Sequence, residues 1–279
     1  MTDVLPTPTG QQQLDPDKLQ ADLARARQET VGPVPLIQQS MDPTFKLPRG
    51  LMYSGTWHTQ VTVRELTGID EEVLARVKTV QDMFDSVIAL GTTRIGTMEL
   101  SSMPLAERQG LLQTLLLGER DQLYLAVVRA TYGDEKVLKY TCPACNEEQD
   151  LTIVISEDFK PKEVEGAAGT EFSYHTSKGQ IITYRPAIGS DQIEALNKKG
   201  ASPAEQNTII LSRCIKAVDG QLVVNPIEYA RGLPMRDRTS LLDLLMERQP
   251  TVSLDLTINC AVCREEQTIS LGWGDLFRP

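Results

Sequence analysis

The sequence predicts an α+β fold made of two related units that follow an extended N-terminal arm. Three observations predict this fold. A strand-like motif near residue 61 recurs 121 residues later, a helix-start motif near residue 119 recurs 118 residues later, and a pair of cysteines recurs at the same 118-residue spacing. Because the three matches keep the same order, an internal duplication explains them better than convergence of three ordinary motifs.

The composition is that of an acidic globular protein. The 279 residues include 28 Lys or Arg and 38 Asp or Glu, which gives a net charge of −10, and 41% of them are hydrophobic. This balance argues against the basic surface that nucleic-acid binding needs. No run approaches the roughly 20 apolar residues that span a bilayer, and the first residues lack the basic and apolar regions of a signal peptide. We therefore expect assembly in the cytoplasm, without a membrane.

Residues 1–46 predict an arm with one short helix. The segment is polar and rich in proline, a composition that does not build a core. Asp15 followed by Pro16 is a typical helix start, and Leu19 and Leu23 then fall on one helical face. A short helix with few apolar anchors is marginal on its own, so we expect the arm to bind a neighbouring subunit.

The first unit is expected to span residues 47–160. It opens with an alternating strand that leads through a glycine to Asp70, placed to cap a helix. Apolar residues then recur at helical spacing from Val73 to Val87. A second helical stretch is expected from Ser102 to about Tyr132, with a break near Gly118.

The second unit, residues 161–279, repeats this order. Its strand leads to Asp191, and Asp219-Gly220 predicts a tight turn. The expected helices are Gln192–Lys199, Pro203–Lys216 and Arg236–Glu247. Each unit thus has the order strand, helix, helix and, at its end, a cysteine hairpin.

The cysteine pairs carry the chemistry of the chain. Cys142 and Cys145 lie between two strand-like segments, and so do Cys260 and Cys263; over eight positions from the first cysteine, five residues are identical. Two cysteines that flank two residues in a hairpin turn are typical of a zinc knuckle, and four thiolates complete a tetrahedral structural zinc site. The sequence therefore predicts a zinc-ribbon-like four-cysteine site that joins the two units, although 114 residues separate the two knuckles.

Other uses of the cysteines are less well supported. A redox pair needs a lowered thiolate pKa, which the acidic pairs Glu147-Glu148 and Glu265-Glu266 oppose. Disulfides fit poorly with the absence of a secretion signal, and an iron–sulfur cluster remains a further alternative. A catalytic zinc would need an open position, which four cysteines do not leave.

No other residues suggest catalysis. The chain has only two histidines, His58 and His175, which we interpret as surface loop residues, and Cys214 lies in an apolar run typical of a buried position. The adjacent acidic residues behind each knuckle point to opposite faces of a strand, so they do not converge on a substrate. We expect no enzymatic activity.

Several motifs resemble a known family. They are Leu117–Leu125, Arg129–Gly133 and Tyr140–Cys145, together with the ending Cys260–Cys263 and Ser270–Phe277. These segments are similar to the baseplate hub assembly family of T-even-type contractile-tailed phages and related contractile injection systems, over about residues 47–279. The chain departs from the family at Ala261, where proline is usual, and at Asn146 and Arg264, where glycine is common.

The resemblance implies a structural component of a tail baseplate or its hub, found in the virion and assembled in the host cytoplasm. It implies contacts with other baseplate and tail proteins, and it brings no catalytic residues. Two other hypotheses remain: a nucleic-acid-binding zinc-ribbon accessory protein, and a transient tail assembly chaperone. The acidic balance argues against the first.

Overall fold

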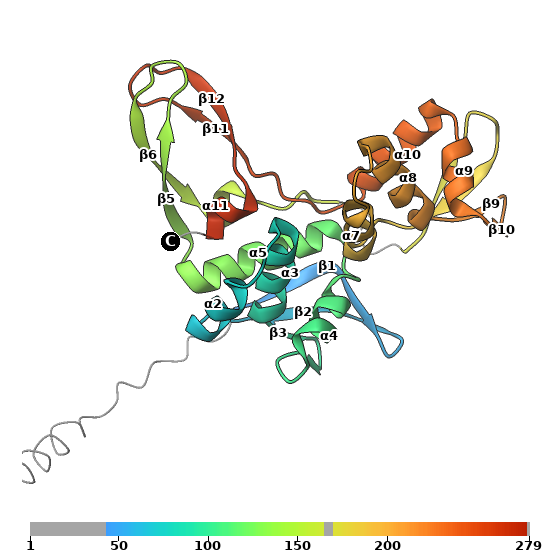
Figure 1. Ribbon diagram of the computed structural model, residues 1–279, viewed down its shortest axis with the longest axis horizontal. Helices are drawn as coiled ribbons and strands as arrows, with labels where there is room; N and C mark the ends of the chain where they lie inside the picture. Colours follow the sequence, from blue (N-terminus) through green and yellow to red (C-terminus); the bar gives the residue numbers. More distant parts are fainter. Residues whose placement is uncertain (1–42, 165–169, 278–279) are drawn as a thin grey trace, which may run out of the picture. The chain divides into compact units, whose positions relative to one another are not determined.

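A computed structural model describes residues 43–164 and 170–277 (Figure 1). The described chain is a mixed α+β structure with four small antiparallel sheets, which confirms the α+β part of the predicted fold class. Most of the expected arm, residues 1–42, lies outside the described residues. Of the remaining arm residues, Thr44–Lys46 already form the start of the first strand, where they pair with Gln60–Thr62, so this part of the predicted arm belongs to the folded body.

The first half of the described chain, residues 43–164, mixes strands and helices along the sequence. In chain order these are β1 (Thr44–Tyr53), β2 (Thr56–Val63), α2 (Gly68–Leu74), α3 (Val80–Gly91), β3 (Thr92–Ile95), β4 (Met98–Glu99), α4 (Leu105–Leu112), α5 (Leu117–Tyr132), β5 (Glu135–Thr141), β6 (Glu148–Val154) and α6 (Ile155–Asp158).

The second half, residues 170–277, presents the same types of element in the same order. They are β7 (Phe172–His175), β8 (Ile181–Tyr184), α7 (Gly189–Asn197), α8 (Pro203–Cys214), β9 (Ile215–Val218), β10 (Gln221–Leu222), α9 (Pro226–Gly232), α10 (Met235–Glu247), β11 (Asp255–Asn259), β12 (Glu266–Ser270) and α11 (Trp273–Phe277).

The sheets of the two halves have the same strand order. The strands β1-β2-β3-β4 form one four-stranded antiparallel sheet, and β7-β8-β9-β10 form the other in the corresponding order. Each half then ends in a separate two-stranded hairpin, β5–β6 or β11–β12, followed by a short helix. Every element of the first half therefore has a counterpart in the second.

The first helix of each half is capped by a carboxylate, but not in the way the sequence suggested. Asp70 and Asp191 lie at the third helical position rather than at the cap. Asp70 accepts a hydrogen bond from the backbone N–H of Thr67 at 2.8 Å, and Asp191 accepts one from Ile188 at 3.0 Å. The side chain reaches back because the first N–H groups of a helix have no partner within it.

Both carboxylates also bind the arginine that follows the preceding strand. Arg64 contacts Asp70 at 2.8 Å and Arg185 contacts Asp191 at 2.6 Å. Arg213 of α8 adds a second ion pair to Asp191 at 2.7 Å. The strand–helix connection is thus fixed by the same bidentate pairing in both halves.

A buried carboxylate near the start of each long helix binds the first hairpin of its half. Glu119 of α5 accepts hydrogen bonds from the backbone N–H groups of Arg49 and Gly50 at 2.5 and 2.6 Å. Asp237 of α10 accepts from the N–H of Ser177 at 2.9 Å. These bonds tie β1–β2 to α5 and β7–β8 to α10.

Several expected boundaries were wrong. The stretch from Val73 to Val87 is two helices, α2 and α3, because residues 75–79 leave the helical conformation. The break expected near Gly118 lies just before it, at residues 113–116, and Gly118 itself lies inside α5. The helix expected to reach Lys216 ends at Cys214, directly before β9. The helix α11 was not expected.

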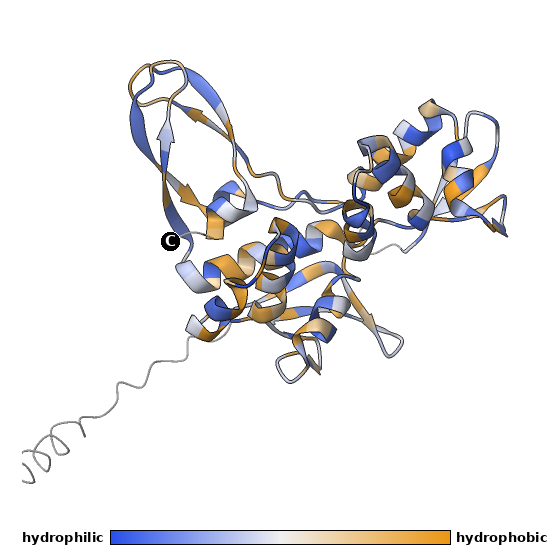
Figure 2. Ribbon diagram, viewed as in Figure 1, coloured by the Kyte–Doolittle hydropathy of each residue, from blue (hydrophilic) through white to orange (hydrophobic). Residues whose placement is uncertain are grey.

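Two apolar cores support these elements. One lies within the second half, between its sheet and α8 to α10. The other fills the first half, where Figure 2 shows hydrophobic residues concentrated on α3 and α5, and it also takes in Val252 and Leu276 from the second half. Trp273 of α11 packs edge-on against Phe84 and Tyr124, with ring centroids 5.3 and 5.2 Å apart. Helix α11 is therefore part of the first core.

Candidate metal centre

Two antiparallel hairpins present the four predicted cysteines. In β5–β6 the pairing is regular from Glu135 opposite Val154 up to Thr141 opposite Glu148, and β11–β12 is equally regular. The Cys142 N–H donates to the Glu147 carbonyl at 3.0 Å, and the Cys260 N–H donates to the Glu265 carbonyl at 2.9 Å. The two turns therefore close in the same way.

Each turn ends in a residue with left-handed backbone conformation. Asn146 has φ = 61° and Arg264 has φ = 66°. Glycine adopts this conformation without strain, which explains why it is common after such knuckles. Asparagine tolerates the conformation better than most residues, whereas arginine is held there at a cost.

The four sulfur atoms lie close to one another without forming disulfides. Cys142 Sγ is 3.8 Å from Cys263 Sγ, and Cys145 Sγ is 3.7 Å from Cys260 Sγ. All four lie within 4.8 Å of one another, and the thiols are free. A zinc–sulfur bond of about 2.3 Å in a tetrahedron separates the sulfurs by about 3.8 Å. The donor set thus fits one tetrahedral metal ion such as zinc, with two ligands from each hairpin.

The burial of the four thiols is unequal. Cys142 and Cys260, the first cysteine of each pair, are only 0% and 1% exposed, whereas Cys145 is half-buried and Cys263 is exposed. The cluster therefore has a covered side and a side near solvent. A metal ion could reach the sulfurs from the solvent side without opening either core.

Gln149 of β6 connects the two hairpins beside the sulfurs. Its Nε2 donates to Cys260 Sγ at 3.2 Å, and its Oε1 accepts from the Ala261 N–H at 3.0 Å. No role for Gln149 was expected from the sequence. A signal was present, because glutamine is one of the five identities between the motifs and recurs as Gln267.

Hydrogen bonds also favour the thiolate form of one cysteine. The N–H of Cys263 and then the Gln149 amide lower the pKa of Cys260 to about 6. A deprotonated sulfur is the form that binds a metal ion. The local donors therefore prepare Cys260 as a ligand.

A comparison of the sequence with protein-family models identifies the family. The family described as "T4 bacteriophage base plate protein" matches residues 56–278. The chain belongs to this phage baseplate family. The predicted resemblance is thus confirmed over most of the chain, including both cysteine pairs. No curated protein and no solved structure matches the chain.

Baseplate proteins are structural parts of phage tails, so membership implies contacts with other tail proteins. In this baseplate chain the four cysteines form the only cluster of three or more His, Cys, Asp or Glu ligand atoms within residues 43–164 and 170–277. His58 lies in β2 and His175 in β7, so both belong to strands rather than loops. Neither joins the cluster.

The other groups singled out by the sequence lie apart from the cluster or face solvent. Cys214 is buried in the second core, as expected, and burial raises the pKa of its thiol to about 12. The acidic residues behind the knuckles are exposed, and Glu148 pairs with Lys139 at 3.0 Å. They are solvated charges of the hairpins.

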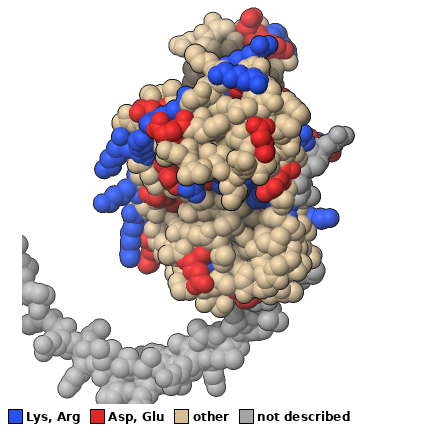
Figure 3. Space-filling model, turned by 90° about the vertical axis from the view of Figure 1, so that its right-hand side faces the viewer, with Lys and Arg blue, Asp and Glu red and all other residues tan. Residues whose placement is uncertain are grey.

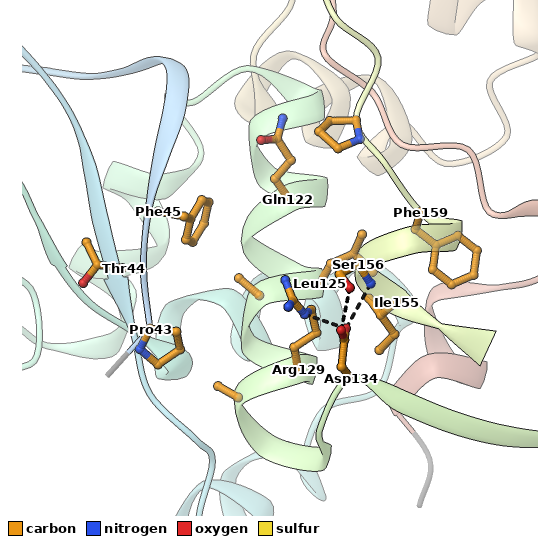
Figure 4. A pocket seen from close by; sticks show the side chains of 13 residues that line it. Pro43, Thr44, Phe45, Gln122, Leu125, Arg129, Asp134, Ile155, Ser156 and Phe159 are labelled. Carbon is orange, nitrogen blue, oxygen red and sulfur yellow. Dashed lines mark hydrogen bonds and ion pairs between the residues drawn. The ribbon is translucent and has the colours of Figure 1, made fainter. Parts of the chain in front are cut away.

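A cavity of this baseplate chain lies away from the cysteines (Figure 4). It has a volume of about 500 Å³ and lies between the start of β1, one side of α5 and α6. Its polar side chains bind one another: Asp134 pairs with Arg129 at 2.7 Å and accepts hydrogen bonds from Ser156. Phe45 and Ile155 belong to its apolar wall. This arrangement fastens α5 to α6.

On the face shown in Figure 3, neither positive nor negative side chains predominate. Lys and Arg side chains there are mixed with Asp and Glu and separated by uncharged areas. None of the described helices combines the length and apolar character needed to cross a bilayer.

Proposed function

We propose that this chain is a non-enzymatic structural component of a contractile-tail baseplate, at or near the hub, in which one structural zinc ion joins two related halves. The observation that carries the proposal is the cluster of four free sulfurs in a chain of a baseplate family. Cys142 and Cys145 would supply two ligands, and Cys260 and Cys263 the other two.

The repeated architecture supports an origin of the two halves by duplication, with units at residues 47–160 and 161–279. The halves share the order of their elements, the strand order of their sheets and the Arg–Asp pairing at the first helix. Independent convergence would have to reproduce all three features together. A duplicated unit with a two-cysteine hairpin holds only half of a structural site, so the complete site requires both copies.

The role of the metal in this proposal is mechanical. Bound zinc supplies four strong bonds between segments that are far apart in the sequence, and four thiolates leave no position for a substrate. Structural zinc contributes on the order of 10 kcal/mol to the folding of small domains. Here two apolar cores also stabilise the chain, so the contribution should be smaller.

The proposal assigns the part of the predicted 1–46 arm that precedes β1 to binding a neighbouring baseplate subunit. The segment has scattered apolar residues, among them Leu19, Leu23 and Leu36, in a polar and proline-rich context. Such segments fold when they bind and place small anchors along an extended path. A chain lacking residues 1–40 should fold and keep its metal but fail to enter particles.

Quantitative mass spectrometry of purified particles tests the function. The proposal expects the chain at a fixed ratio to the sheath protein in intact tails. If the chain is needed for assembly but is missing from finished particles, it is a transient assembly chaperone instead. Retention on heparin or DNA at moderate salt would favour the nucleic-acid-binding alternative, which the net charge of −10 opposes.

A further inference from the structure

The contact between the two halves is one-sided, although the halves are alike. Residues 187–190, which include the end of the β8–α7 connection and the first two residues of α7, lie on residues 113–120 around the start of α5. The N–H of Gly189 donates to the Leu115 carbonyl at 3.1 Å, and the N–H of Ser190 donates to the Gln113 carbonyl at 2.9 Å. Leu117 packs against the core of the second half. We name this contact the internal junction.

The internal junction depends on a close approach between Gly189 and Arg120. A Cβ atom at Gly189 would lie 2.5 Å from Arg120 Nη1, so no larger residue fits there without movement. Arg120 is 1% exposed beneath this backbone and pairs with Asp85 of α3. The glycine thus allows the second half to cover a buried arginine.

The counterpart of the covering segment is open in the first half. Thr67, Gly68 and Ile69 correspond to residues 188–190, and all three are exposed; Ile69 is 77% exposed. A Cβ atom added at Gly68 would meet no heavy atom within 4 Å, and the φ of Gly68 is not left-handed. The fold of a single chain therefore gives no reason for glycine at 68, whereas the internal junction gives one at 189.

The counterpart of the covered surface is open in the second half. Leu233, Pro234 and Met235 correspond to residues 115–117. The Leu233 side chain is buried in the second core, as Leu115 is in the first, but Met235 is 84% exposed where Leu117 is packed. Arg238 corresponds to Arg120. It donates a hydrogen bond to Thr208 at 3.0 Å, and Thr208 occupies the position in α8 that Asp85 occupies in α3. Met235 therefore lacks the contact that Leu117 makes with the core of the other half.

We propose that the face formed by Thr67, Gly68 and Ile69 in one copy of the chain packs on the face formed by the backbone of Leu233 and by Pro234, Met235 and Arg238 in a second copy. The first is called the front face and the second the rear face. Gly68 then lies over Arg238 as Gly189 lies over Arg120, and Ile69 contacts the region of Met235. The proposal rests on the observed correspondence of the halves and does not depend on the metal or on a place in the baseplate.

The chemistry of the two faces fits self-association better than an accidental exposure. Ile69 stands where the internal junction has Ser190, and Met235 stands where it has Leu117, so the open pair is at least as apolar. Arg236 takes the place of Gly118, which the backbone of Pro250 crosses closely. That crossing is therefore particular to the internal junction and is not repeated between copies.

The two faces are different, so the contact is heterologous. An open stack keeps one free front face at one end and one free rear face at the other, so association continues head to tail until a ring closes or a filament grows. Only a few residues of each copy form the contact, so free copies should associate weakly, and a ring would gain from the simultaneous closure of its contacts.

Sedimentation of the full-length chain tests the proposal. Concentrations of about 1–100 µM cover weak and moderate affinities. The wild type should form concentration-dependent oligomers. Ile69→Asp and Met235→Asp should each weaken association by about 100-fold or more, because each buries an unpaired carboxylate in the contact. Both positions are exposed in the single chain, so circular dichroism and the melting temperature should remain those of the wild type. Val137→Asp, at an apolar position that is 63% exposed on β5, is the matched control and should leave association unchanged.

Mixing the two variants gives the decisive result. The Ile69→Asp chain keeps its rear face and the Met235→Asp chain keeps its front face, so an equimolar mixture should form a dimer and stop there. A monomeric wild type, association that survives either variant, equal weakening by Val137→Asp, or a mixture that stays monomeric would overturn the proposal.

Discussion

Gln149 of the first cysteine hairpin binds Cys260 of the second: its Nε2 lies 3.2 Å from the Cys260 sulfur. The same side chain accepts a hydrogen bond from the backbone of the neighbouring Ala261 at 3.0 Å. One residue outside the four-sulfur cluster thus links two hairpins whose first cysteines are 118 residues apart in the sequence. Groups that bind metal ligands in this way orient them and adjust their basicity.

Replacing Gln149 with alanine should weaken zinc binding by about tenfold, because the hydrogen bonds to the ligand and to its turn are lost. Competition with a chromophoric chelator measures this change. Gln267→Ala is the matched control, since Gln267 is the counterpart of Gln149 in the second hairpin. Equal losses in the two variants would mean that the cross-hairpin bonds of Gln149 have no special role.

Cys142→Ser and Cys260→Ser should lower the melting temperature by similar amounts, because each leaves three thiolates at a shared site. Differential scanning calorimetry of the purified variants measures the effect. Cys214→Ala is the control: it removes a buried thiol from the second core and should leave the zinc content unchanged. If one of the two serine variants is as stable as the wild type, the two hairpins do not share a site.

Asp191→Asn should destabilise the chain by about 3–5 kcal/mol, because Arg185 and Arg213 would lose the carboxylate they share in a buried position. Asp70→Asn, the matched change in the first half, should cost less, since among the described residues Asp70 pairs with one arginine, Arg64, whose side chain is 30% exposed. Urea denaturation of both variants at neutral pH compares them. Equal costs would contradict this explanation.

The same carboxylate predicts a loss of stability in acid. Burial alone would raise the pKa of Asp191, but the hydrogen bonds from Arg185, Ile188 and Arg213 lower it below its usual value. A lowered folded-state pKa adds stability above about pH 4, which is lost as the pH falls through that pKa. The stability difference between wild type and Asp191→Asn should therefore be constant near neutral pH and shrink below about pH 4.

Asp121 should behave in the opposite way. Burial raises the pKa of this α5 carboxyl to about 7. A raised carboxyl pKa makes the folded state bind a proton that the unfolded state has released, so stability falls as the pH rises from about 4 to 7. Asp121→Asn should be about 1–3 kcal/mol more stable than the wild type at pH 8 and equal to it near pH 4. An equal effect at both values would show that the carboxyl is not perturbed.

Gly189→Ala should destabilise the contact between the halves by about 1–3 kcal/mol, because the added methyl group meets the Arg120 side chain. Gly68→Ala is the matched change in the first half, where nothing lies within 4 Å of the added atom, and it should not destabilise the single chain. Chemical denaturation of both variants measures the difference. A destabilised Gly68→Ala would contradict the description of residue 68 as open.

The sequence predicted the features that depend on local pattern. The alternation of residues predicted β8, and the cysteine motifs predicted both cysteine hairpins. The predicted Asp219-Gly220 turn has the positive φ values of 50° and 78° expected of a tight hairpin. These features follow from residues that are near neighbours in the chain, so their physical causes are visible in the sequence.

Long-range packing explains what the sequence did not predict. The helix α11 has five residues and little local signal, and its position follows from the contacts of Trp273 with Phe84 and Tyr124. The bond from Gln149 to Cys260 likewise arises only when distant hairpins meet. The one-sided contact of Gly189 with Arg120 depends on how the halves pack, which a repeated sequence does not specify.

X-ray absorption spectroscopy of the freshly purified full-length chain, with zinc measured by mass spectrometry in the same sample, tests the shared metal site most directly. We predict about one zinc per chain, coordinated by four sulfur atoms at about 2.3 Å. Reduced thiols with little or no zinc, or zinc coordinated by nitrogen and oxygen, would contradict the claim that the four cysteines join the two halves through one metal ion.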